Sequence, residues 1–145
     1  MKKMKLFLHY ATTHPNAIVI FRTSDMILAV HSNTLYLYEI KSRIRSGGHF
    51  FMSKNAENLA NNETVLTIAH MIKNVMFSAE EAELGAIYIN FREDVPDQHT
   101  LEDMGHKQPP TPVQTDNTTA LRVVKNNVTK KLKLMDMKIH WLRCR

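Results

Sequence analysis

Residues 78–91, which read SAEEAELGAIYINF, decide the fold. Four apolar side chains in this stretch stand at positions i, i+3, i+4 and i+7, and so form one face of a helix: Leu84, Ile87, Tyr88 and Phe91. Ser78 followed three residues later by Glu81 is a capping box, which predicts that the helix begins near Ser78. The helix dipole also favours acidic residues in a first turn, so Glu80 and Glu81 need no further role.

Several short apolar runs rich in β-branched and aromatic residues precede this helix, and each predicts a strand. They cover residues 17–21, 26–30, 35–38, 49–52 and 65–69. Ser46-Gly47-Gly48 predicts a turn between two of these strands, and the Asn-rich residues 55–62 predict a loop. Together these signals predict an antiparallel meander.

The pattern changes again after the central helix. Three prolines, Pro109, Pro110 and Pro112, break whatever structure precedes them. Residues 113–115 then predict a short strand that leads to Asp116, and residues 118–126 predict a second helix. The order of strands, helix, strand and helix predicts an α+β fold, a mixed sheet with flanking helices.

The composition places the chain in the globular class, because 43% of its 145 residues are hydrophobic and 23% are charged. No apolar run approaches the roughly 20 residues needed to cross a bilayer, and the N-terminal residues match a signal peptide poorly. Cys144 is the only cysteine, which excludes an internal disulfide and a cysteine-based zinc site. We therefore expect an intracellular chain, cytoplasmic or nuclear, that is not secreted and has no membrane partner.

Charge is distributed unevenly along the sequence. Residues 51–116 are predominantly acidic, whereas from residue 118 onward eight lysines and arginines stand against the single Asp136. A metal-dependent nucleic-acid enzyme needs both kinds of segment, because carboxylates hold the metal and basic groups hold phosphates. Solvated surface charge is an equally simple explanation of the basic end. The candidate nucleic-acid-binding residues there are Lys125, Lys130, Lys131, Lys133, Lys138 and Arg143.

Three polar segments are candidates for chemistry, and each also has a structural interpretation. Glu83 lies early in the central helix, where acidic residues are common. Asp116 follows a predicted strand and precedes a predicted helix, where an aspartate often serves as an N-cap. Asn33 ends the segment Val30-His31-Ser32-Asn33, which alone indicates only a polar turn.

Taken together and in this order, the three segments resemble the RNase H domain of copia-type retrotransposon polyproteins, the region that adjoins the reverse transcriptase. The family has an Asp after its first core strand, a Glu in an Ala-Glu-Leu segment that opens a helix, and an Asp in a Thr-Asp-Asn segment. The corresponding positions here are Asn33, Glu83 and Asp116. Residues 5–15 resemble the linker that leaves the reverse transcriptase, and residues 42–53 and 135–143 resemble further family segments. The resemblance therefore covers nearly the whole chain.

The resemblance implies a linker at residues 1–15 and an RNase H-like domain at residues 16–145. It implies hydrolysis of RNA in RNA–DNA hybrids with two divalent metal ions, Mg²⁺ or Mn²⁺. Glu83 and Asp116 would be catalytic residues and metal ligands. The implied partners are an RNA–DNA hybrid or another nucleic acid, bound weakly, and a reverse-transcriptase domain.

Two departures from the family pattern indicate an inactive, degenerate copy. Asn33 replaces the first Asp, and an amide brings no negative charge to a two-metal site. The family's fourth acidic residue would lie beyond Arg145, so we expect a C-terminally incomplete domain. Three alternatives remain: a non-catalytic nucleic-acid-binding module of domesticated retroelement origin, an active Mg²⁺-dependent nuclease with a substitute ligand, and an unrelated small α+β domain.

Overall fold

The computed structural model describes residues 2–39, 43–54 and 62–125. The elements in chain order are α1 (Lys2–Thr13), β1 (Ile27–Glu39), β2 (Arg43–Ser53), β3 (Thr64–Ile72), α2 (Ala79–Asp103), β4 (Val113–Gln114) and α3 (Thr118–Lys125). They form an α+β fold in which a four-stranded mixed sheet, of order β3-β2-β1-β4, is accompanied by three helices. The prediction of an α+β fold with a mixed sheet is confirmed.

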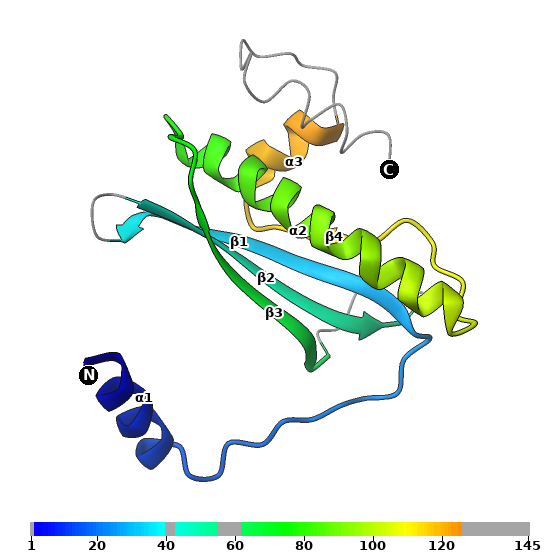
Figure 1. Cartoon of the computed structure of the whole chain (residues 1–145), viewed down its shortest axis with the longest axis horizontal. Coiled ribbons are helices and arrows are strands. Elements are labelled where there is room, and N and C mark those ends of the chain that lie inside the picture. Colours follow the sequence, from blue (N-terminus) through cyan, green and yellow to red (C-terminus); the bar gives the residue numbers. More distant parts are fainter. Residues whose placement is uncertain (1, 40–42, 55–61, 126–145) are drawn as a thin grey trace.

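The connections between strands explain why the sheet is mixed. β1, β2 and β3 are successive antiparallel neighbours, which confirms the predicted meander. β4 instead pairs in parallel with β1, through Val30 opposite Val113 and His31 opposite Gln114. Parallel strands need a long crossover connection, because the chain must return to the same edge of the sheet before the second strand begins. That connection contains α2, which lies across one face of the sheet (Figure 1).

The central strands are longer than the sequence pattern predicted. Residues 26–30 and 35–38 were expected in two strands, but β1 runs without a break through the polar residues between them. The prediction of a turn at Ser46-Gly47-Gly48 is wrong, because these residues lie inside β2 and pair with residues 32–34 of β1. The polar residues of β1 and the glycines of β2 are residue types that are also common in turns, yet here their backbone groups complete one antiparallel ladder.

The N-terminal segment departs from expectation in two places. Residues 2–13, for which no helix was predicted, form the helix α1, and residues 17–21, expected as a strand, belong to no strand. Within the described residues, α1 contacts neither the sheet nor the other helices. Figure 1 shows it standing apart at the end of an extended segment. Among the described residues no strand pairs with residues 17–21, so β propensity alone does not make them a strand.

The core lies between the sheet and α2. One cluster joins Leu28 and Val30 of β1 to Phe50 of β2 and Leu101 of α2. A second cluster gathers side chains of β2, β3, α3 and the N-terminal half of α2, and its buried members include Ile44, Ile72, Leu84, Ile87, Ala120 and Val123. The predicted apolar helix face is therefore the face that packs on the sheet.

The predicted start of α2 is confirmed by its cap. Ser78 is the N-cap, and its Oγ accepts a hydrogen bond from the backbone N–H of Glu81 at 3.1 Å. The Glu81 carboxylate accepts in turn from the N–H of Phe77 at 2.7 Å. Glu81 thus completes a capping arrangement and has a structural role. None of the helices that the structure describes is long and apolar enough to cross a membrane.

Candidate active site

Glu83 is a buried carboxyl group on the face of α2 that meets the sheet. Its side chain is 6% exposed. Thr34 of β1 donates a hydrogen bond from Oγ1 to Glu83 Oε1, whereas Glu83 Oε2 is buried and has no hydrogen-bond partner among the described residues. Burial raises the pKa of Glu83, the Thr34 hydrogen bond opposes this, and the negative charge of Asp116 raises the pKa further.

Asp116 lies in the short connection between β4 and α3, and its side chain is exposed. It is not the N-cap that the sequence suggested as its structural role. The cap is Asn117, whose Oδ1 accepts hydrogen bonds of 3.0 Å from the backbone N–H groups of Thr119 and Ala120. Because β4 is the parallel neighbour of β1, the connection after β4 brings Asp116 within electrostatic range of Glu83. Two of the three predicted site positions are therefore near enough for their charges to interact.

Asn33, the third predicted position, lies on the opposite face of the sheet. Its neighbours Ser32 and Thr34 both bond to side chains of α2. Since successive side chains of a strand point to opposite faces, Asn33 faces away from α2. Its side chain is exposed, and its Oδ1 accepts a hydrogen bond from the N–H of Thr34 at 2.7 Å. In this register, Thr34 is the residue of β1 that meets Glu83.

A buried amide fixes the helix to the two central strands beside this site. Asn90, 1% exposed, donates from Nδ2 to Ser32 Oγ at 2.9 Å and to the carbonyl of Gly47 at 3.0 Å. Gly48 makes room for it, because a Cβ built there would lie 2.5 Å from Asn90 Oδ1. Asn90 therefore holds β1 and β2 in place two helical turns from Glu83.

The donor set can be compared with the needs of a divalent ion. Glu83 offers one buried oxygen without a partner, and Asp116 offers a second carboxylate close enough to repel it. A hard dication relieves such repulsion and accepts carboxylate oxygens with bound water. Within the described ranges, however, no group of three or more His, Cys, Asp or Glu side chains is placed to hold a metal ion. The residues fit one weakly held ion better than a bridged pair.

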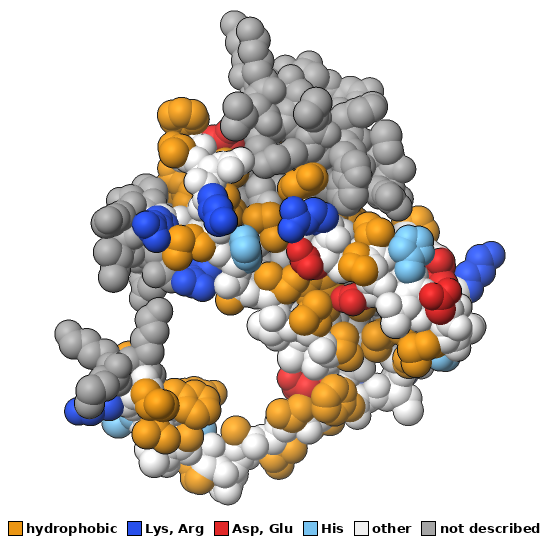
Figure 2. Space-filling view, viewed as in Figure 1, with side chains coloured by type: hydrophobic (Ala, Val, Ile, Leu, Met, Phe, Trp, Pro, Cys, Tyr) orange, Lys and Arg blue, Asp and Glu red, His pale blue; other side chains and the backbone are white. Residues whose placement is uncertain are grey.

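The predicted nucleic-acid-binding residues lie mostly outside the described part of the chain. Lys125 is the last residue of α3, and the other predicted positions, Lys130, Lys131, Lys133, Lys138 and Arg143, fall in residues 126–145. Different basic side chains are described over β2 and β3. Arg45 donates from Nη1 to the carbonyl of Ala69 at 3.1 Å, and Arg43 reaches Met71. Figure 2 shows several Lys and Arg side chains gathered over this part of the sheet.

A cavity adjoins these basic groups. It has a volume of about 380 Å³ and lies between β3 and α2. Ile72, Met76 and Tyr88 supply apolar walls, and Lys73 and Arg92 supply positive charge.

Comparison of the chain with protein-family models, with curated proteins and with solved structures gave no match.

Two residues of the site were not singled out from the sequence: Thr34 and Asn90. The sequence signal for Thr34 is the period-two pattern of a continuous strand, which places Val30, Ser32 and Thr34 on one face. The interpretation of residues 31–34 as a turn concealed that pattern. Asn90 lies seven residues after Glu83, two helical turns along the same face, and this spacing could have indicated it.

Proposed function

We propose that this chain is an RNase H-like domain of copia-type retroelement origin in which hydrolysis of RNA in RNA–DNA hybrids is severely reduced. The observation that carries the proposal is the electrostatic proximity of Glu83, buried early in α2, to Asp116, just after the strand parallel to β1. This is the order of elements in which the resembling family carries its acidic residues. The mixed sheet, with α2 in the crossover between β3 and β4, is compatible with that assignment.

The reduced activity follows from the charge that remains. A two-metal mechanism needs a carboxylate that bridges both ions, and the β1 positions that face α2 beside Glu83, Ser32 and Thr34, carry hydroxyl groups. When bound, a divalent ion supplies an activated water and stabilises the leaving oxygen. Glu83 and Asp116 would hold that ion. The Thr34 hydroxyl keeps Glu83 oriented through its hydrogen bond.

Cleavage and binding of a labelled RNA–DNA hybrid test the proposal together. The full chain is expected to bind the hybrid in a salt-dependent manner and to cleave it very slowly with Mg²⁺ or Mn²⁺. Glu83→Gln should remove any cleavage, whereas Glu102→Gln, at the exposed far end of α2, should leave it unchanged. A folded chain that binds no nucleic acid would contradict the proposal. Rapid cleavage that depends on Glu83 would contradict the reduced activity alone.

A non-catalytic nucleic-acid-binding module is a second candidate, and the basic surface over β2 and β3 favours it. Arg43, Arg45, His70 and Lys73 are all described there. Each phosphate contact removed should lower the slope of log affinity against log salt by about one. Lys73→Gln is therefore expected to lower that slope, and Lys107→Gln, beyond the acidic end of α2, is the matched control. Equal slopes of log affinity against log salt for the two variants would contradict a phosphate contact of Lys73 on this surface.

A further inference from the structure

The C-terminal half of α2 contains a buried carboxyl group that the candidate active site does not use. Asp94 is 1% exposed. Its Oδ2 accepts a hydrogen bond of 2.7 Å from Thr111 Oγ1, and Thr111 Oγ1 accepts one from Gln98 Nε2. Asp94 Oδ1 is buried and has no hydrogen-bond partner in the described part of the chain. A buried carboxylate oxygen without a donor is unfavourable, so this atom points to a missing partner.

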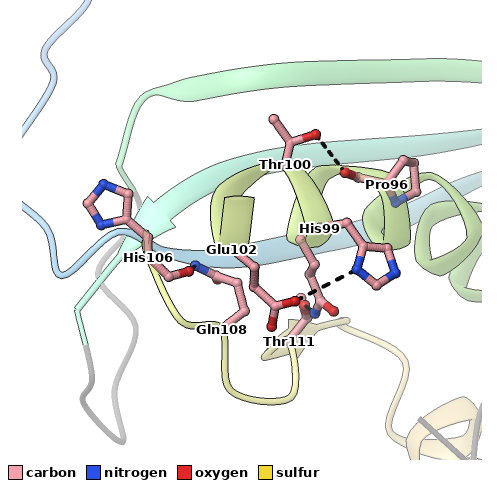
Figure 3. A network of polar contacts seen from close by, with 8 residues as sticks. Pro96, His99, Thr100, Glu102, His106, Gln108 and Thr111 are labelled. Atoms are coloured by element: carbon pink, nitrogen blue, oxygen red, sulfur yellow. Dashed lines mark hydrogen bonds and ion pairs between the residues drawn. The ribbon is translucent and has the colours of Figure 1, made fainter. Parts of the chain in front are cut away.

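Asp94 lines a cavity of about 260 Å³ between α2 and the loop that leads to β4. Its other walls include Phe91, Val95, Gln98, Pro110 and Thr111. Figure 3 shows Gln108 and Thr111 lying beside the last turns of the helix. Gln108 fixes this loop to β1, because its Nε2 donates to the carbonyl of Met26 at 2.9 Å and its Oε1 accepts from the N–H of Leu28 at 3.0 Å.

Acidic residues predominate on the part of α2 that borders the cavity. Glu93, Asp97, Glu102 and Asp103 share this half of α2, and its last turn has no basic residue. The C-terminus of a helix carries a partial negative charge, which adds to the effect. Figure 2 shows acidic side chains gathered toward this end of the helix.

The basic groups on the same helix have acidic partners of their own. Arg92 pairs with Glu93 at 3.3 Å, and His99 pairs with Glu102 at 3.7 Å. The neighbouring charge that raises the pKa of Asp94 is that of Asp97, which is also an acid. The helix side of the cavity is therefore predominantly acidic, and Asp94 Oδ1 is an acceptor that this part of the chain does not satisfy.

We propose that this cavity binds a small organic cation, an alkylammonium or alkylguanidinium group whose N–H donors reach Asp94 Oδ1. Such a group supplies both the charge and the hydrogen bond that the carboxylate lacks. Phe91 and Val95 offer an apolar wall to the alkyl chain, and an aromatic ring also attracts a cation. The cavity is smaller than the roughly 300–1,000 Å³ of pockets for drug-sized ligands, which suits a short amine.

Titration with putrescine and agmatine tests the proposal, with 1,4-butanediol as the uncharged control at matched ionic strength. At about pH 7.5 the amines, and not the diol, should raise the Tm of the full chain in a saturable manner. Asp94→Asn should weaken binding by roughly tenfold or more, because a charge-assisted hydrogen bond is lost. Asp103→Asn, which changes an exposed acid on the same helix, should bind like the original chain.

The competing explanation is a buried acid that has no ligand. No saturable response, or an equal response of the original chain and Asp94→Asn, would overturn the proposal. Since burial raises the pKa of Asp94 to about 6, amine binding should also weaken as the pH falls below that value. A pH-independent affinity would contradict the assigned acceptor.

The same chemistry could be supplied by a free amine or by a basic side chain of another protein. N-acetyl-lysine amide and N-acetyl-arginine amide distinguish these sources, because they carry the cationic group on a bulky backbone. Binding of agmatine alone would assign the cavity to a free amine, and binding of both kinds would assign it to a presented side chain as well. Both outcomes support the organic-cation site.

Discussion

Asp94 makes the stability of the chain depend on pH. Burial raises its pKa from 3.8 to about 6, the Thr111 hydrogen bond opposes this, and the charge of Asp97 adds to the rise. A carboxyl group with a higher pKa in the folded state binds its proton more tightly when folded. Its contribution to the free energy of unfolding is therefore largest below the unfolded value and falls as the pH rises through about 6.

Asp94→Asn should remove this dependence. The stability of the variant relative to the original chain is expected to increase between about pH 4 and pH 7, by roughly 1–3 kcal/mol. Urea denaturation of both proteins across this range, without added amine, measures the difference. Comparing the two chains cancels other titrating groups, including Glu83. A constant difference across the range would show that Asp94 is not the group responsible.

Gly48 and Gly47 are adjacent in β2 but should respond differently to a methyl group. A Cβ at Gly48 would lie 2.5 Å from Asn90 Oδ1 and 2.9 Å from the Phe50 ring. A Cβ at Gly47 would have the carbonyl oxygen of Asn33 as its nearest neighbour, at 3.5 Å. We expect Gly48→Ala to lower the free energy of unfolding by roughly 1–3 kcal/mol. Gly47→Ala should be close to neutral. Equal effects in urea denaturation would contradict the packing of Asn90 against β2.

At the scale of elements, the sequence predicted those whose local signals and tertiary packing agree. The cap at Ser78 and the apolar face of residues 84–91 predicted α2 correctly, and the β-branched runs in β2 and β3 predicted parts of those strands. β1 was predicted as two strands because His31, Ser32 and Asn33 lack apolar character. Their polarity is explained by partners that the sequence does not reveal, since Ser32 bonds to Asn90, 58 positions away.

The start of α3 gives an element-scale prediction with a neighbouring control. Asn117→Ala removes the side chain that accepts two backbone N–H groups, so it should lower stability by about 1 kcal/mol. Asp116→Ala removes no cap and should leave the stability nearly unchanged, although it removes the negative charge near Glu83. Thermal unfolding followed by circular dichroism compares the two. A larger loss for Asp116→Ala would mean that Asp116 supports the helix.

At the scale of the whole molecule, α1 is separate from the packed domain. Met4, Phe7, Leu8 and Tyr10 are all exposed, and α1 makes no contact with the sheet or with α2 and α3 among the described residues. Deletion of residues 1–13 is therefore expected to leave the Tm of the domain within about 1–2 °C, since no buried contact is lost. A fall of several degrees in differential scanning calorimetry would show that α1 packs on the domain in solution.

The candidate site could be predicted only in part, because the sequence does not show which face of β1 each side chain occupies. Glu83 and Asp116 lie in segments whose elements were predicted correctly, and the fold brings them together. Asn33 was assigned by resemblance, but the face on which its side chain lies depends on the register of β1. A shift of one residue moves a side chain to the other face, and the sequence pattern did not fix that register. An acidic residue on β1 that is to complete the site should therefore stand at position 34, which faces Glu83, rather than at position 33.

The most direct test of the account is the rescue of hybrid cleavage by a carboxylate on the α2 face of β1. Thr34→Asp, which places an acid beside Glu83, is predicted to produce Mg²⁺-dependent cleavage of an RNA–DNA hybrid, accompanied by a rise in Tm with Mg²⁺. The same substitution combined with Glu83→Gln should show neither effect, and Asn33→Asp should remain inactive. A folded Thr34→Asp protein that binds the hybrid without cleaving it, or cleavage restored by Asn33→Asp alone, would contradict the account.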